Sequence, residues 1–477
     1  RTATTSQPHK RKTKMSAWGK GGTARSCDAL LRKVEQNDPR LTELVILSNK
    51  DFGSKEVERL AVAIENGRNT HLASVSASGH SLSVGSLMRL GAALARGGKS
   101  SAIKHLAIGN KDMGDDGVCA LCDGLVSDDS NGGCQLESID LSWKGIGPKG
   151  MQHIIQTLGA LPMLTTLNLS RNEKIGTFTF PTDRFIALRE LNISDCNLND
   201  TCGLLEQQQQ HHQGNHTIAV LRMNGNDFSA TDKLSIHPSS SITELYLENC
   251  NIGNSGFQTL ASSFSHAQNH SMKILSIADN GIGPAGLEFL TDNLKDMPQL
   301  EELNLANNPL DEGSVEKFGK VLGILKSDDS VAKSQLSKLD MTGAQCGIRG
   351  ASSLIEHGKL QELRLFNNQL GNGFANQLQG ALKGGHPTLS MLDVGGNGAS
   401  DDEVAALLEA LTMVDEDKPS FQNELKVLLV GGNKTGPRVE EMVKKVQAIF
   451  PDIDIARDKP KTEQQQQQQQ QFPPGFP

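Results

Sequence analysis

Apolar and polar residues follow one recurring order along most of this chain. An apolar residue is followed by two variable residues, a second apolar residue, one variable residue, a third apolar residue and, after two more variable residues, asparagine or a substitute. Leu300, Leu303, Leu305 and Asn308 show this order most clearly. Matching the chain to this frame gives about 14 units, spaced about 24 to 36 residues apart, which predicts a stack of repeated units. The frames begin at residues 42, 72, 103, 136, 164, 188, 218, 242, 272, 300, 336, 360, 389 and 425.

Each frame predicts a short β-strand with one buried face. The second and third apolar residues are two positions apart, so they point to the same face of a strand. The residue between them, and the variable residues on either side, point to the opposite face. In the first frame Thr42, Val45 and Leu47 take the three places, so we expect Ile46 to face outward there.

The segments between the strands carry a helical pattern. Residues 54–67 place apolar side chains at intervals of three and four, which gives a helix one apolar face, and residues 286–294 and 403–411 repeat this pattern. Units of about 28 to 31 residues have room for a full helix, whereas a unit of about 24 leaves room for a short helix or an irregular turn. One strand–helix unit is too small to bury both apolar faces, so stacking of neighbours must supply the core.

The asparagine place that ends each frame predicts a ladder of buried hydrogen bonds. A buried amide there can bond the backbone of adjacent turns and so satisfy their polar groups. Cys196 and Cys250 take the same place, where a thiol bonds more weakly. Because Lys50, Lys111 and Lys144 replace the amide near the N-terminus, we expect that half of the chain to be less regular. Asparagine fills the place at residues 172, 226, 280, 308, 368, 397 and 433.

The spacing of the frames and the helical segments resemble the ribonuclease-inhibitor-like subclass of leucine-rich repeats over roughly residues 27–457. The resemblance implies an α/β solenoid in the shape of a horseshoe, with parallel strands on the concave face and helices on the convex face. We expect a capping helix at 27–36, a last helix at 439–449 and a terminal strand at 452–455. Such a solenoid is expected to be a protein–protein interaction scaffold that binds a macromolecular partner on its concave face.

Three polar segments fall outside the repeat pattern. Residues 1–26, with a basic run at 9–14, are expected to form a disordered tail, with nuclear import or an acidic partner as alternatives for the run. Residues 458–477 are expected to form a disordered tail rich in glutamine and proline, and Gln207–Gln213 should loop away from the core. The Phe-Pro-Pro-Gly-Phe-Pro sequence at 472–477 has an alternative role as an extended ligand for a proline-binding module.

Composition narrows the partners and the location. The chain has 47 Lys and Arg against 55 Asp and Glu, a net charge of −8, so we expect no nucleic-acid partner and a protein partner with a basic surface. The chain has no run of 18 apolar residues, so we expect no membrane span. The eight cysteines are sparse and irregular, which favours a reducing, cytoplasmic location over a secreted disulfide framework. We also expect a monomer that needs no cofactor.

No motif in the sequence predicts catalysis, so we do not expect an enzyme. The sequence lacks a phosphate-binding loop, a nucleophile elbow and a His-Glu-x-x-His zinc motif. Cys119 and Cys122 form a C-x-x-C, but they lie in a predicted helix, where packing is favoured over metal or redox use. Metal binding by His211, His212 and His216 is an alternative that depends on the glutamine-rich segment.

The residues that point into the concavity are the candidates for partner binding. The only tyrosine and one of the two tryptophans of the chain fall on or beside this face, and Tyr, Trp and Arg are the residues that most often anchor interfaces. We expect a patch centred on Tyr246 with Arg222, Arg364 and Phe366, although Arg222 alternatively pairs with an acid of a neighbouring strand, Glu244 or Glu248. The candidate partner-binding residues are Asp140, Trp143, Arg171, Asn192, Arg222, Glu244, Tyr246, Glu248, Arg364 and Phe366.

Two further resemblances give alternative functions. Residues 30–44 carry a helix, an Asn-Asp-Pro turn and an entering strand, and a helix ending at residues 65–66 and a strand from Leu72 follow. Together these roughly 45 residues resemble the opening of the tropomodulin/leiomodin repeat domain, which implies actin or cytoskeleton binding. Ribonuclease-inhibitor-like arrays are also similar to the Ran GTPase-activating proteins, which implies a GTPase-activating regulator. This chain departs from that second family, because its tail is rich in glutamine and proline instead of acidic residues and no catalytic arginine segment matches.

Overall fold

The computed structural model describes residues 26–457 of the chain, with gaps. The gaps are residues 67–68, 128–132, 207–217, 232, 238–239, 265–270, 328–332, 372, 384 and 414–423. The two tails expected at 1–26 and 458–477 therefore lie outside the described residues, apart from Ser26, and so does the glutamine–histidine run at 207–213.

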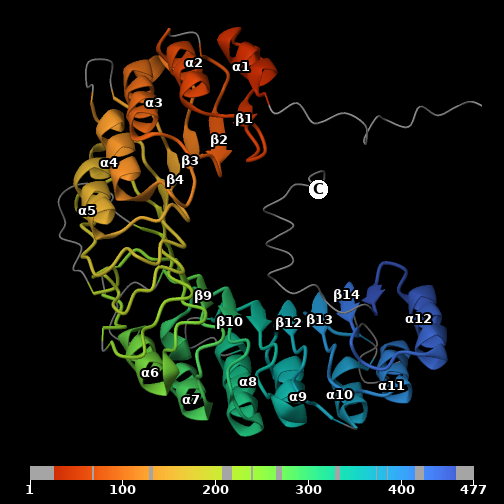
Figure 1. The fold of residues 1–477 in the computed structure, drawn as a ribbon. Helices are drawn as coiled ribbons and strands as arrows, with labels where there is room; N and C mark the ends of the chain where they lie inside the picture. Colours follow the sequence, from red (N-terminus) through yellow and green to blue (C-terminus); the bar gives the residue numbers. More distant parts are fainter. Residues whose placement is uncertain are drawn as a thin grey trace, which may run out of the picture.

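The described strands form one parallel sheet in which they follow each other in sequence order (Figure 1). The sheet lines the inner curve of an open horseshoe, as the sequence predicts, and its last strand is the terminal strand expected at 452–455, displaced by about one residue. The strands are β1 (Glu43–Val45), β2 (Ser74–Ser78), β3 (His105–Gly109), β4 (Ser138–Asp140), β5 (Thr166–Asn168), β6 (Glu190–Asn192), β7 (Val220–Arg222), β8 (Glu244–Tyr246), β9 (Ile274–Ser276), β10 (Glu302–Asn304), β11 (Lys338–Asp340), β12 (Glu362–Arg364), β13 (Met391–Asp393), β14 (Val427–Leu429) and β15 (Asp454–Ala456).

The described helices lie on the outer curve and pack side by side (Figure 1). The expected helices at 27–36, 54–67, 286–294, 403–411 and 439–449 correspond to α1, α2, α7, α11 and α12. The helices are α1 (Asp28–Glu35), α2 (Ser54–Glu65), α3 (Val84–Gly97), α4 (Gly114–Leu125), α5 (Pro148–Thr157), α6 (Gly253–Phe264), α7 (Pro284–Asn293), α8 (Glu312–Ser327), α9 (Gly347–His357), α10 (Phe374–Leu382), α11 (Asp401–Thr412) and α12 (Pro437–Ile449).

The apolar places of the frame form the core between the sheet and the helices. Leu300, Leu303 and Leu305 are buried, and the register aligns each frame with the next, as in the pairing of Leu303 with Leu339. The first frame was predicted one residue too late. Val45 is 44% exposed and Ile46 only 2% exposed, because a one-residue shift of register exchanges the two faces of a strand.

The predicted hydrogen-bond ladder is present at the asparagine place. The Oδ1 atom of Asn172 accepts from the N–H groups of Lys144 and Ile146, at 2.9 and 3.1 Å. Its Nδ2 atom donates to the carbonyls of Leu141 and Leu169, at 2.9 and 2.7 Å. In the same place the thiol of Cys196 donates to the Leu169 carbonyl over 3.3 Å. Where asparagine or cysteine fills this place, a buried side chain thus bonds the repeat to the preceding one.

The N-terminal half is the less regular half, as the sequence predicts, but the irregularity does not lie in the repeats that have lysine at the asparagine place. Helices α2 to α5 are all present in these repeats. Lys144 is only 4% exposed, and burial lowers the pKa of its amine. Helices are missing instead from the described residues between β5 and β8. Phe180 and Phe185, with ring centroids 4.7 Å apart, and Phe228 are buried there. These large rings fill the core where other repeats use a helix.

Candidate functional site

The middle column of the concave face consists of the residue between the two buried positions of each strand. Six strands carry Asp or Asn in this column, and in all six the side-chain oxygen accepts the N–H two residues later. This local bond closes a turn at the end of the strand. The pairs are Asp140 with Ser142 (2.8 Å), Asn168 with Ser170 (3.1 Å), Asn192 with Ser194 (3.0 Å), Asn304 with Ala306 (3.0 Å), Asp340 with Thr342 (2.9 Å) and Asp393 with Gly395 (2.8 Å).

Two of the predicted partner residues, Asp140 and Asn192, therefore have a structural role within their own strands. Their position on the concave face was taken as evidence of partner binding, and the local bond is a sufficient reason for both residue types. The sequence signal for this role was available, because Asp or Asn recurs at the same place of the frame in strand after strand.

Arg222 and Tyr246 stand in the middle column on two adjacent strands, where neighbouring strands have Asp or Asn. They are register partners on β7 and β8, and the guanidinium carbon of Arg222 lies 4.1 Å from the centroid of the Tyr246 ring. The Nε atom of Arg222 donates to Glu190 on β6 over 3.3 Å, whereas the alternative considered from the sequence was Glu244 or Glu248. The Arg222 side chain remains 32% exposed. We call Arg222 and Tyr246 the Arg–Tyr pair.

Two acidic residues, Glu190 and Glu244, bond the Arg–Tyr pair. The Tyr246 hydroxyl donates to Glu244 over 3.0 Å, and burial raises the pKa of this phenol, so the hydroxyl stays a donor. Glu248 binds other neighbours, because its carboxylate accepts from the Asn224 amide over 3.3 Å and from the Ser276 hydroxyl. The pair is thus a preformed cationic and aromatic surface with carboxylates around it.

Arg364 and Phe366 do not belong to the same patch as the Arg–Tyr pair. Strands β9 to β11 separate β8 from β12, which at about 4.8 Å a strand puts β12 about 19 Å away. Arg364 lies 3.5 Å from Asp340 on one side, and its charge lowers the pKa of Asp393 on the other. Burial is the larger effect on Asp393 and raises the pKa of its carboxyl to about 6. The predicted patch is therefore two sites.

Trp143 and Arg171 lie at the rim of the concave face, beyond the ends of β4 and β5. Both have left-handed backbones, with φ of 56° and 60°, and their side chains are highly exposed, at 62% and 63%. The same place in later repeats holds Gly225 and Gly343, which adopt this conformation without steric penalty. An exposed tryptophan in a conformation that favours glycine is a candidate contact residue, because local structure does not require it.

The remaining candidates for chemistry are structural. Cys122 is fully buried in α4, and burial raises the pKa of its thiol to about 12, which favours the packing interpretation of the C-x-x-C. Among the described residues no group of three or more His, Cys, Asp or Glu could hold a metal ion. The histidines at 211, 212 and 216 lie outside the described residues. In the part of the chain that is described, no helix is long and apolar enough to cross a membrane.

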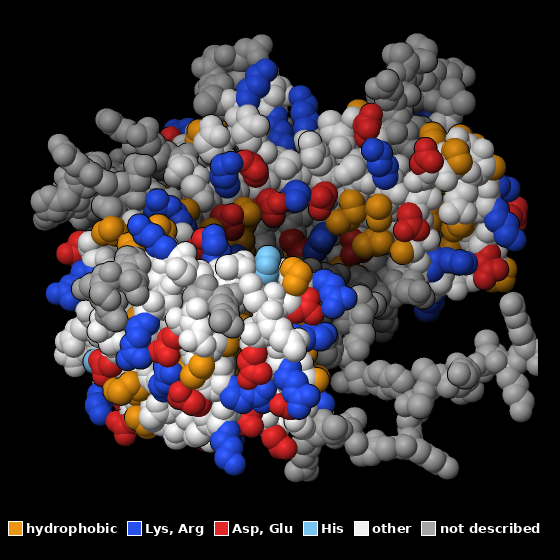
Figure 2. All heavy atoms as spheres, turned by 90° about the horizontal axis from the view of Figure 1, so that it is seen from above, with side chains coloured by type: hydrophobic (Ala, Val, Ile, Leu, Met, Phe, Trp, Pro, Cys, Tyr) orange, Lys and Arg blue, Asp and Glu red, His pale blue; other side chains and the backbone are white. Residues whose placement is uncertain are grey.

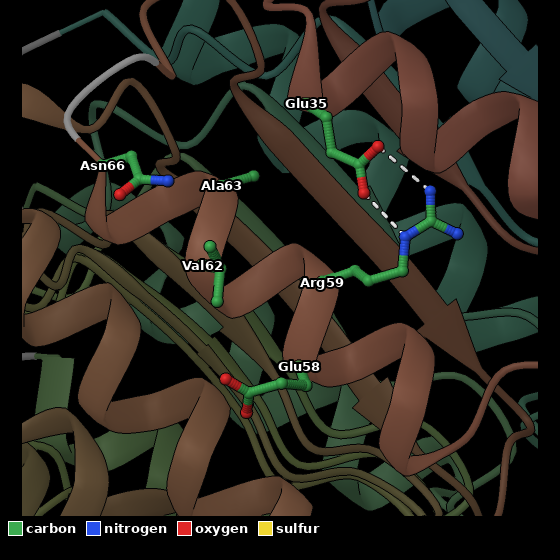
Figure 3. Close-up of a pocket in the computed structure, with 6 residues that line it drawn as sticks. All are labelled: Glu35, Glu58, Arg59, Val62, Ala63 and Asn66. Atoms are coloured by element: carbon green, nitrogen blue, oxygen red, sulfur yellow. Dashed lines mark hydrogen bonds and ion pairs between the residues drawn. The ribbon is translucent and has the colours of Figure 1, made fainter.

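A shallow pocket of about 290 Å³ lies on the convex side, against α1 and α2 (Figure 3). The guanidinium of Arg59 donates to both carboxylate oxygens of Glu35, at 2.6 and 3.0 Å, and to Asp28 at 2.6 Å. These bonds join α2 to α1, and the other acid of the lining, Glu58, is bonded to Arg89 on α3. The arrangement fits a contact between the capping helix and the first repeat better than a ligand site.

The segment at residues 30–44 contains α1, a turn and β1 in the order that its tropomodulin-like sequence implies. Asn37 in the turn has a φ of 51°, and its amide bonds Thr70 over 2.8 Å. A helix, a turn and a strand in this order do not test actin binding, which stays a prediction, as does the GTPase-activating alternative.

Two family models match parts of the repeat array. The model described as Leucine Rich repeat matches residues 160–177, 239–261 and 268–290, and the model described as Leucine Rich Repeat matches residues 299–321. The chain is 24% identical over 323 residues to ribonuclease inhibitor from Sus scrofa, a match that covers 59% of this chain and 68% of that protein. These matches agree with the repeat frame and the sheet.

The chain is also similar to two further proteins. NACHT, LRR and PYD domains-containing protein 5 from Homo sapiens is 24% identical over 316 residues, which cover 65% of this chain and 23% of that protein. Among solved structures, an internalin from Listeria monocytogenes str. 4b F2365 is 15% identical, with a TM-score of 0.36, over 91% of this chain and 93% of that one.

Proposed function

Because the chain is a leucine-rich-repeat protein whose array is similar to that of ribonuclease inhibitor, we propose that it binds a protein partner on its concave face. The contact is centred on the Arg–Tyr pair. One observation carries this proposal: Arg222 and Tyr246 replace Asp or Asn where those residues would close a turn, so the chain gives up a local bond on two adjacent strands. Arginine and tyrosine are among the residues that contribute most to binding energy at interfaces.

The charges around the pair define the chemistry of the partner. Glu190, Glu244 and Glu248 surround the single cation of Arg222, so this part of the face has an excess of negative charge. A partner with Lys or Arg side chains around an apolar or aromatic group would complement both the carboxylates and the Tyr246 ring. Such charges speed association more than they raise affinity, so binding should weaken as salt increases.

Trp143 and Arg171 belong to the proposed contact as outer residues. They lie beyond the ends of β4 and β5, at the rim of the same concave side, and both are highly exposed. Figure 2 shows that basic, acidic and hydrophobic side chains are interleaved over the surface seen from above, without one large patch of a single kind. A partner would therefore be recognised by a few anchoring residues within a mixed surface.

The test is affinity purification with the full chain and a variant carrying Arg222→Asn and Tyr246→Asn. Asparagine is the residue that this column holds on neighbouring strands, so the variant keeps the strand ends bonded. We expect captured partners to fall by at least about tenfold, because each anchoring residue contributes about 1–2 kcal/mol or more. The control is Arg438→Ala on α12, whose side chain is 66% exposed on the convex face. Partners that both variants retain equally would overturn the proposal.

A further inference from the structure

The C-terminal end of the concave face carries more apolar side chains than its middle. The outward residues of the last three strands are Met391 and Asp393 on β13, Val427 and Leu429 on β14, and Asp454 and Ala456 on β15. Of these, Met391, Val427, Leu429 and Ala456 are apolar and half-buried, whereas Asp393 is buried and Asp454 is exposed. Met391 and Val427 are register partners, and Leu429 is the register partner of Ala456. These four residues form a continuous surface, which we call the apolar end.

One edge of the apolar end consists of an aromatic ring and bare backbone. The Phe366 ring lies so close to Gly396 that a Cβ atom there would be 2.8 Å from it, and a Cβ atom at Gly395 would be 2.9 Å from the same ring. Gly432 on the next repeat is in contact distance as well. Only glycines fit beneath the ring. Phe366 is therefore a fixed, half-buried platform beside the four apolar side chains.

We propose that residues 472–477 of this same chain, Phe-Pro-Pro-Gly-Phe-Pro, bind to the apolar end. The described part of the chain leaves the sheet from β15, directly beside β14, and ends at Arg457. From there to Phe472 are about 15 residues, which span at most about 50 Å when extended. A segment of this length reaches every part of the apolar end.

The chemistry of the segment matches that of the surface. Residues 472–477 carry two phenylalanines, three prolines and no charge. Proline-rich segments adopt an extended helix with little conformational entropy to lose, and they bind to grooves lined by aromatic side chains. The apolar end offers the Phe366 ring and four apolar side chains for such a segment, with Asp454 exposed on the outermost strand, whereas the side chains of the Arg–Tyr pair are bonded to carboxylates.

Tethering makes a weak contact sufficient. A segment joined through a short linker is present at an effective concentration in the millimolar range, so a dissociation constant of about 1 mM already gives substantial occupancy. The contact is independent of partner binding at the Arg–Tyr pair, because β9 to β12 lie between β8 and the apolar end.

The experiment follows the methyl resonance of Met391 in full-length protein labelled with ¹³C at the methionine methyl groups. A phenylalanine ring above the methyl group shifts its resonance upfield. We expect this resonance to differ from that of a full-length variant with Phe472→Ser and Phe476→Ser, while the resonance of Met113, on the N-terminal arm, is unchanged. A synthetic Phe-Pro-Pro-Gly-Phe-Pro peptide added to the variant should restore the native position, and the unmodified chain should need about tenfold more peptide for any further change.

A second variant tests the surface itself. Leu429→Asn introduces the residue that the same column holds at Asn304, so the strand end can keep its bond. It should reduce the response of Met391 to the peptide by at least about threefold, the effect of losing one buried apolar side chain. The proposal is overturned if Met391 has the same resonance with and without Phe472 and Phe476. It is also overturned if the shift depends on protein concentration, because the contact would then join two copies.

Discussion

The middle column of the concave face differs between β4–β6 and β7–β8, although these five strands are neighbours in one sheet. On β4–β6 the residue is Asp140, Asn168 or Asn192, and its oxygen is bonded to the N–H two residues later. On β7 and β8 it is Arg222 or Tyr246, whose side chains contact each other and the acids beside them. Facing the concavity is therefore not evidence of partner binding by itself. The stronger evidence is an outward residue that makes no side-chain bond to the backbone at the end of its own strand.

We expect the largest loss of stability when the hydrogen-bond ladder, which supports both groups of strands, is interrupted. Asn172 is 1% exposed, and its side chain makes five bonds to the backbone of two repeats. Replacing it by alanine leaves buried donors and acceptors unpaired, so we expect the free energy of unfolding to fall by about 3–5 kcal/mol. Urea denaturation measures this loss. Cys196→Ala is the matched control and should lose clearly less, because its thiol makes only weak bonds. Equal losses would contradict the assigned role of the ladder.

The next largest effect is a pH-dependent change of stability at Asp393. This residue makes the same local bond as the Asp and Asn residues of β4–β6, but it is only 3% exposed. Burial raises the pKa of its carboxyl in the folded state to about 6, above the value of about 3.9 in an unfolded chain. The folded state therefore holds the proton more tightly, and its stability is lost as pH rises from about 4 through about 6.

Asp393→Asn should remove this loss, because asparagine keeps the acceptor for the Gly395 N–H and carries no charge. We expect the variant to gain up to about 2 kcal/mol over the native chain at pH 7.5, and to gain much less at pH 4.5. Urea denaturation at the two pH values measures the difference. Two stability curves that run parallel from pH 4.5 to 7.5 would show that the carboxyl does not carry this penalty.

A smaller effect tests the comparison directly. Asn192→Ala removes the local bond to Ser194 and should lower the free energy of unfolding by about 1 kcal/mol. Partner capture should change by less than about twofold. The Arg222→Asn and Tyr246→Asn variant should show the opposite behaviour, with a large loss of capture and a stability change below about 1 kcal/mol. If Asn192→Ala also abolished capture, the distinction between the two groups of strands would be wrong.

The smallest effect is a gain of stability at the rim. Trp143 has a φ of 56° and is 62% exposed, so glycine should relieve its backbone at little cost in packing. We expect Trp143→Gly to raise the free energy of unfolding by about 0.5–1 kcal/mol and to weaken partner capture. Thermal denaturation measures the first change. A loss of stability would indicate instead that the indole packs within the folded chain.

The sequence predicted the strands and the ladder because burial restricts residue types most strongly there. It failed at β1, where Leu41, Leu44 and Ile46 fit the frame as well as the triplet one residue later. Between β5 and β8 it left a short helix or an irregular turn open for the units of about 24 residues, and large rings such as Phe180 fill the core there with no helix in the described residues. Repeat spacing therefore predicts strands better than it predicts what lies between them.

The candidate site was less predictable than the fold. Tyr246 and Arg222 were identified from residue type and from their place in the frame, and the structure brings them together because that place aligns across β7 and β8. The grouping with Arg364 was not correct, since residues that share a column can be several strands apart. The role of Asp140 was missed because a bond to the backbone two residues later leaves no trace in apolar periodicity.

The direction of the ladder has a consequence for how the protein is made. Each amide bonds the turn of the repeat before its own: Asn226 accepts from the N–H groups of Cys196 and Leu198, and Asn172 from those of Lys144 and Ile146. A ribosome delivers the N-terminal repeats first, so each turn emerges without its partner and is completed only when the following repeat leaves the exit tunnel. A nascent chain paused at such a repeat then exposes one unfinished turn at its growing edge.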